Sequence, residues 1–128
     1  MKQIVLNKVF YQRLSLLFLT ILFTTSTAWA DASGYCGDPD VNDGHNVSWT
    51  YVESTHTLTI SGAGAMADFT PANAPWQEYC ENDITKIVIS DGITTIGYAA
   101  FGGCYQLTDV NIPNTVTSIG AYGFCDCI

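Results

Sequence analysis

Basic residues are the scarcest charged group in this chain. Four lysines and arginines stand against twelve aspartates and glutamates, and the formal net charge is −8. Three of the four lie in the first thirteen residues, so residues 31–128 keep Lys86 alone against all twelve acidic residues. Such a surface repels phosphate backbones, and we expect no nucleic-acid partner. It also disfavours binding to anionic membrane surfaces.

Long apolar runs are lacking as well. The longest, Leu14 to Phe23, has ten residues, whereas a membrane-spanning helix needs about 20. A basic start precedes this run and Ala28-Trp29-Ala30 follows it, which is the arrangement of an export signal. We therefore predict a signal peptide at residues 1–30, cut between Ala30 and Asp31, and a mature chain without a membrane span. The competing interpretation is an uncleaved membrane anchor.

Motifs of catalysis and metal binding are missing too. There is no G-x-S-x-G elbow and no phosphate-binding loop. His45 and His56 lie eleven residues apart, without H-x-x-x-H spacing. Residues 38–44 carry alternate carboxylates like a calcium loop, but Asp43 takes its glycine slot and Trp49 its glutamate slot. The sequence thus predicts a protein that is not an enzyme and has no cofactor and no metal.

What the sequence does contain is an internal repeat of 23 residues. Sliding the chain by this period brings the large apolar residues of 84–106, apart from Val88, onto apolar residues of 107–128. One such unit cannot bury its own apolar face, so neighbouring coils must cover each other. Twelve positions are assigned to this shared core: Ile84, Ile87, Ile89, Ile96, Phe101, Cys104, Leu107, Val110, Ile112, Ile119, Phe124 and Cys127. An ordinary β-domain with a coincidental echo is the alternative.

Each unit opens with an alternating β-branched segment that is typical of a strand. Turn residues follow, then a second apolar pair, and then Gly97 or Gly120, which we expect to let the chain turn sharply. Residues 98–101 and 121–124 each carry one phenylalanine and are interpreted as a single helical or 3₁₀ turn. The predicted fold is a β-rich repeat solenoid, with Phe101 stacked over Phe124 and Ile96 over Ile119.

These units resemble the BspA-type leucine-rich repeats, which carry the phrase "IP-x-x-V-T-x-IG-x-x-AF-x-x-C-x-x-L". Ile112-Pro113, Val116-Thr117 and Ile119-Gly120 match its first half, and Ala100-Phe101 with Cys104 match its second. Ser90-Asp91 and Gly123 depart from it without affecting the expected fold. The resemblance implies a leucine-rich-repeat surface protein that takes part in adhesion.

Residues 31–83 do not follow the period and are interpreted as an N-terminal β-rich cap. Val47, Trp49 and Tyr51 alternate on one face, and residues 56–60 alternate likewise, which predicts a hairpin. Trp76 is expected to pack its indole over the open end of the first repeat. Asn46-Val47-Ser48 also has the form of a glycosylation sequon.

Five cysteines are present, and an odd count leaves at least one thiol over or one intermolecular bond. Cys104 and Cys127 occupy equivalent positions and are expected to lie one above the other. Two buried free thiols are the favoured interpretation. An inter-coil disulfide is the alternative.

The expected binding surface is the outward side of the two repeat strands, formed by Lys86, Val88, Ser90, Asp109, Asn111 and Pro113. The expected partners are extracellular or host-surface proteins. Because about three repeats are normally needed for stable stacking, we also expect that 84–106 and 107–128 are the first repeats of a longer solenoid. The alternatives are an accessory or spacer segment of a larger exported enzyme or glycan-binding protein, and a truncated remnant without function.

Overall fold

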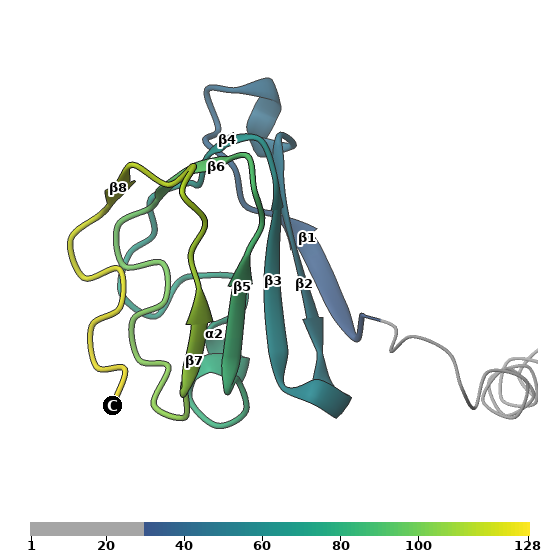
Figure 1. Cartoon of the computed structure of the whole chain (residues 1–128), viewed down its shortest axis with the longest axis vertical. Helices are drawn as coiled ribbons and strands as arrows, with labels where there is room; N and C mark the ends of the chain where they lie inside the picture. Colours follow the sequence, from purple (N-terminus) through teal and green to yellow (C-terminus); the bar gives the residue numbers. More distant parts are fainter. Residues whose placement is uncertain (1–29) are drawn as a thin grey trace, which may run out of the picture.

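The computed structural model describes residues 30–128, so the predicted export signal lies, apart from Ala30, outside the described residues. Strands dominate, and the single α-helix of this part of the chain is one turn long (Figure 1). The elements in chain order are β1 (Ala32–Tyr35), η1 (Asn42–Gly44), β2 (Val47–Val52), η2 (Glu53–Thr55), β3 (Thr57–Gly62), β4 (Gly64–Ala65), α2 (Gln77–Cys80), β5 (Lys86–Ile89), β6 (Ile93–Ile96), β7 (Asp109–Asn111) and β8 (Ser118–Ile119).

The strands form two sheets. The larger has the order β1-β2-β3-β5-β7, with β1, β2 and β3 antiparallel and β3, β5 and β7 parallel. The smaller is the parallel sheet β4-β6-β8. Each coil therefore gives one strand to each sheet and returns through turns, and the parallel strands of successive coils lie side by side (Figure 1).

The stack reaches one coil further toward the N-terminus than the 23-residue period indicates. β3 pairs with β5 so that Leu58 lies opposite Ile87 and Ile60 opposite Ile89, and all four side chains are buried. β4 pairs with β6 in the same way. We call residues 57–83 the cap coil, 84–106 the first repeat and 107–128 the second repeat. The first repeat consequently has a coil on each side.

The N-terminal hairpin supports the cap coil. Val47, Trp49 and Tyr51 are buried on β2, as their alternation predicts, because this strand presents every second side chain to the core. η2 closes the hairpin, and His56 follows it in the left-handed region with φ of 51°. β1 then covers the outer edge of β2.

Three stacked aromatic rings run through the centre of the coils. Trp76 is fully buried, and its ring centroid lies 5.5 Å from that of Phe101. Phe101 in turn stacks on Phe124 at 5.2 Å, as the repeat predicts. The indole N–H of Trp76 donates a hydrogen bond to the carbonyl oxygen of Ala100 at 2.9 Å, which satisfies its polar group inside the core. The expected placement of Trp76 over the first repeat is thereby confirmed.

The return segments of the repeats are successive turns, and the expectation of a helical or 3₁₀ turn at 98–101 and 121–124 is wrong. Ala99 and Tyr122 have positive φ angles of 51° and 58°, which no right-handed helix accommodates. The reason lies between the coils, where the N–H groups of Ala99, Phe101 and Gly103 donate to carbonyl oxygens of the second repeat. These bonds to the neighbouring coil alternate with bonds inside the turn, such as that from the N–H of Ala100 to the carbonyl oxygen of Gly97, and a continuous helix does not form.

Gly97 and Gly120 are required for close contact between coils, and not for the sharp turn that the sequence suggested. Neither has a positive φ. A Cβ at Gly97 would collide with the carbonyl oxygen of Ala67, and one at Gly120 would lie 2.8 Å from the Cα of Tyr98. Glycine therefore recurs here because the backbone of the preceding coil occupies the space of a side chain.

The core assignments hold for the first repeat and only in part for the second. Ile84, Ile87, Ile89, Ile96, Phe101, Cys104 and Leu107 are all buried. Ile112 and Ile119, however, are 40% and 50% exposed, and Val110, Phe124 and Cys127 are only partly buried. Within residues 30–128, no coil lies on the outer side of the second repeat. These side chains therefore cover the first repeat without being covered themselves.

The buried-thiol interpretation of Cys104 is wrong, because this residue forms a disulfide with Cys80. α2 brings Cys80 to the position that Cys104 occupies one coil later, so the two cysteines face each other across the junction of cap coil and first repeat. Cys127 takes the same position in the second repeat and is a half-buried free thiol, whose Sγ donates to the carbonyl oxygen of Phe101 at 3.2 Å. Cys36 and Cys125 are free as well.

Candidate interaction surface

The outward side of the five-stranded sheet is the candidate interaction surface, and we call it the strand face. Pairing in register places residues of five strands in straight rows, because opposite residues of paired strands point to the same side. One row runs from Thr57 through Lys86 to Asp109. A second runs through Ser33, Thr50, Thr59, Val88 and Asn111.

Four of the six residues predicted for this surface lie in these rows, namely Lys86, Val88, Asp109 and Asn111. Ser90 adjoins them, and its hydroxyl lies 3.3 Å from that of Ser61 on β3. Pro113 follows the end of β7 and is partly buried. The structure thus places Lys86, Val88, Asp109 and Asn111 on one side of the sheet, with Ser90 next to them.

Sequence reasoning missed the half of the strand face that comes from the hairpin. Ser33, Ser48, Thr50, Thr57, Thr59 and Ser61 belong to it. The alternation around Trp49 and Leu58 already placed several of these hydroxyls opposite the core. What the sequence did not show is the parallel pairing of β3 with β5, which joins the hairpin to the repeats in one continuous sheet.

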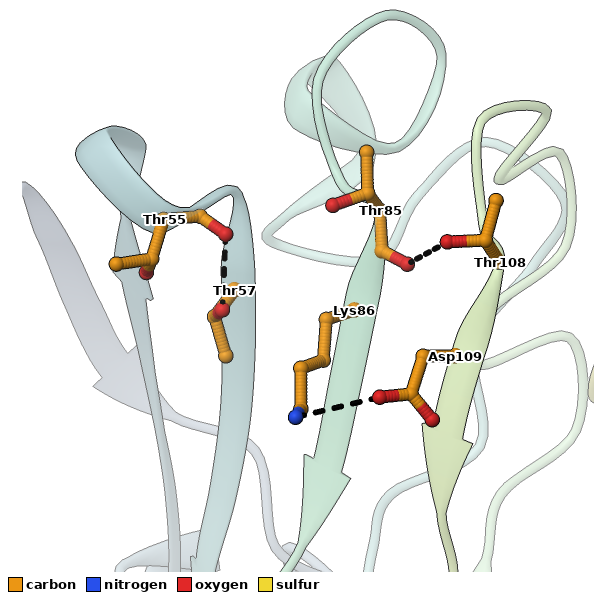
Figure 2. Close-up of polar contacts among 6 residues, drawn as sticks. All are labelled: Thr55, Thr57, Thr85, Lys86, Thr108 and Asp109. Atoms are coloured by element: carbon orange, nitrogen blue, oxygen red, sulfur yellow. Dashed lines mark hydrogen bonds and ion pairs between the residues drawn. The ribbon is translucent and has the colours of Figure 1, made fainter.

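Polar contacts between neighbouring strands order the strand face. Lys86 Nζ lies 3.2 Å from a carboxylate oxygen of Asp109, and the Thr108 hydroxyl donates to the Thr85 carbonyl oxygen at 3.2 Å (Figure 2). Both charged groups are about half exposed, so the pair adds little to stability. The pair does affect the charge of the surface, because the single lysine or arginine of residues 30–128 is already neutralised by an acid.

The sequon residue Asn46 has a structural role. Its amide Nδ2 donates to the carbonyl oxygen of Ala63 at 2.9 Å, and its Oδ1 is buried without a hydrogen-bond partner. A Cβ at Gly64 would come within 3.0 Å of the same amide. The side chain thus contacts the loop that joins the hairpin to the cap coil through its Nδ2, while its Oδ1 is buried.

The part of the chain that the structure describes contains no group of three or more potential metal ligands. Nor does a helix in residues 30–128 have the length and apolar character to cross a membrane. In the calcium-like loop, Asp38 Oδ1 accepts a hydrogen bond from the N–H of Asp40 at 2.9 Å.

Coils that give parallel strands to a shared sheet and stack an aromatic and an aliphatic core define a leucine-rich-repeat protein. Comparison with family models agrees, since residues 76–128 match the "BspA type Leucine rich repeat region (6 copies)". The C-terminal part of this chain thus belongs to the BspA-type leucine-rich repeats, which confirms the resemblance drawn from its motifs.

A solved structure supports the same fold. The chain is similar to a leucine-rich repeat protein from Eubacterium ventriosum, with 38% identity and a TM-score of 0.61 over 74% of this chain. The match spans 24% of that protein, so this chain corresponds to about a quarter of its length. A comparison with curated proteins finds no match.

Proposed function

We propose that this chain is a secreted or cell-surface protein that binds other proteins through its strand face and serves adhesion without catalysis. The family supports an interaction role, since leucine-rich repeats suggest protein–protein interaction and BspA-type members are typically surface or secreted bacterial proteins. The expected partners are extracellular or host-surface proteins. The expected continuation of the solenoid by further repeats would enlarge the same face.

The observation that carries this proposal is the continuity of the strand face across five strands. Its rows present mostly short polar side chains beside the Lys86–Asp109 ion pair, with Thr59 and Val88 near the middle. A flat and ordered surface of this kind suits a protein partner, because little side-chain entropy is lost when it is covered. The binding role is thus assigned to this surface, because the fold alone does not determine function.

The test uses one substitution at two sites. The purified protein is passed over immobilised collagen, laminin and fibronectin, and saturable binding is measured for the wild type, Thr59→Arg and Thr94→Arg. Thr59 lies in the strand face, whereas Thr94 is an exposed residue of β6 in the other sheet. We expect Thr59→Arg to weaken binding about tenfold, because central interface positions typically contribute more than about 1 kcal/mol.

Thr94→Arg should bind like the wild type. Equal loss in both variants would point to an effect of added charge and count against the strand face. Absence of saturable binding to all three matrix proteins would count against adhesion to extracellular matrix.

A further inference from the structure

A second surface feature lies among the turns of the coils. It is a groove of about 350 Å³ between α2 with residues 71–72 on one side and the turns of both repeats on the other. Tyr105 of the first repeat and Tyr122 of the second line it and are 46% and 61% exposed. Glu81, which directly follows α2, and Asp126 of the second repeat supply two exposed carboxylates.

The walls of this groove are held in place by covalent and hydrogen bonds. The Cys80–Cys104 disulfide joins the residue before Glu81 to the residue before Tyr105, with 4.2 Å between the two Cα atoms. The side-chain amide of Gln77 donates to the carbonyl oxygen of Gly102 at 3.3 Å. Because both walls are fixed to the same junction, a ligand that enters the groove meets groups already in place.

The second repeat forms the remaining wall. Tyr122 rests edge-on against Tyr98 at a centroid distance of 5.5 Å and an interplanar angle of 75°. The N–H of Gly103 donates to the carbonyl oxygen of Cys125 at 2.8 Å, which fixes the turn next to Asp126. The aromatic rings and the carboxylates therefore come from three successive coils.

The charge of the groove selects its ligand. Lys86, the single cationic side chain of residues 30–128, lies on the strand face paired with Asp109, so no lysine or arginine of the described chain neutralises Glu81 or Asp126. Exposed tyrosine faces attract cations through their ring electrons. Carboxylates beside them, in a strongly acidic protein, attract the same charge.

We propose that this groove binds a cationic side chain, lysine or arginine, of a partner protein. The site is separate from the strand face and does not depend on the function proposed for it. Tyrosines with carboxylates and an amide would also suit a neutral sugar. The uncompensated negative charge decides for the cation, since a cation is attracted by both carboxylates and by the net charge of the protein, whereas a sugar gains only local hydrogen bonds.

The test follows backbone amides by ¹⁵N NMR while the purified protein is titrated with the blocked peptides Gly-Lys-Gly and Gly-Arg-Gly. A peptide with norleucine in place of lysine keeps the aliphatic stem without the charge, and maltotriose tests the sugar. We expect the two cationic peptides to shift amides of residues 77–81, 102–105 and 122–126. The norleucine peptide and maltotriose should leave them in place.

Two double variants separate local charge from overall charge. Glu81→Gln with Asp126→Asn and Asp40→Asn with Asp91→Asn each remove two exposed acidic residues, the second pair outside the groove lining. The groove pair should weaken cationic binding about two- to fivefold per carboxylate, and Tyr122→Ala about two- to fivefold. The control pair should change it less than about twofold, because these exposed charges lie outside the groove lining and are screened by salt.

Several results would overturn the proposal. Equal shifts with the norleucine peptide, shifts with maltotriose instead of the cations, or equal weakening by the control pair would each do so. The variants remain interpretable because Glu81, Tyr122 and Asp126 are exposed and their replacement leaves the core untouched. Asparagine also tolerates the positive φ of 59° at position 126.

Discussion

The two repeats share one sequence pattern and differ in what surrounds them. Ile96 is fully buried in the first repeat, whereas its counterpart Ile119 is 50% exposed in the second. Ile89 and Ile112 differ in the same way, at 2% and 40%. The first repeat lies between two coils, and the second contacts one. Burial in a solenoid is thus a property of the neighbours of a coil, and equivalent residues need not contribute equally to stability.

The strongest test of this difference between the repeats removes the same side chain from both. We expect Ile96→Ala to lower the free energy of unfolding by about 2–5 kcal/mol, because it leaves a cavity in a packed core. Ile119→Ala should cost about 1 kcal/mol or less, since half of that side chain is already in water. Urea denaturation of both variants measures the difference.

Adding a coil supplies the control. When a copy of residues 106–128 is fused after Ile128, so that the period of 23 residues continues, the cost of Ile119→Ala should rise toward that of Ile96→Ala. Equal costs in the original chain, or no change on fusion, would contradict the role given to the neighbouring coils.

The disulfide allows a second comparison, at the junction of the first repeat with the cap coil. Cys80→Ala with Cys104→Ala should destabilise the protein by about 3 kcal/mol. The bond closes a loop and so restricts the conformations of the unfolded chain, and this restriction is lost in the double variant. Cys127→Ala, which replaces the free thiol at the same position of the second repeat, should cost about 1 kcal/mol. Thermal unfolding without reductant compares them, and a larger effect of Cys127→Ala would contradict the assignment of the bond.

A smaller change in stability is expected from the free thiols, of which Cys36 is buried and Cys125 and Cys127 are partly exposed. Burial raises the pKa of Cys36 from 9.0 to about 12. The stability that the protonated thiol contributes is fully present below its unfolded-state pKa near 9. It is lost as the pH rises toward 12, and the free energy of unfolding is lower by about 1 kcal/mol at pH 10. Cys36→Ala should therefore flatten the loss of stability between pH 8 and 10 in urea denaturation.

Thiol labelling checks the same contrast by another readout. Burial also raises the pKa values of Cys125 and Cys127, but both are partly exposed. Iodoacetamide at pH 8.5 should label them before Cys36. Early labelling of Cys36 would show that the segment after β1, which is bonded to Val47 of β2, opens more readily than its packing indicates.

The sequence predicts most of the stack, because the period of 23 residues places identical contacts in identical positions. The stacking of Phe101 on Phe124 and the pairing of Ile96 with Ile119 follow from it directly. The cap coil is hidden because Leu58 and Ile87 pair across 29 positions, so no constant period reaches it. The partner of Cys104 is hidden for the same reason, since Cys80 lies in that irregular coil.

Only the repeat side of the strand face could be predicted from the sequence. Alternation on β5 and β7 identifies the repeat side of the strand face, and the resemblance to known repeats supports it. The hydroxyls of β1, β2 and β3 join the face only through the pairing of β3 with β5, a contact between segments that local pattern does not reveal. The groove draws Glu81, Tyr105 and Tyr122 from three coils, and nothing in their spacing indicates that they meet.

The equivalence of Cys104 and Cys127 has a consequence for how such a protein changes length. Removing residues 84–106 as a block would set Phe124 against Trp76 and Cys127 against Cys80, each in place of the residue lost. The bond across the junction and the aromatic column would both re-form with new partners. Recombination between the two repeats can therefore shorten or lengthen the molecule by whole coils, while the contacts at the junction with the cap coil are kept.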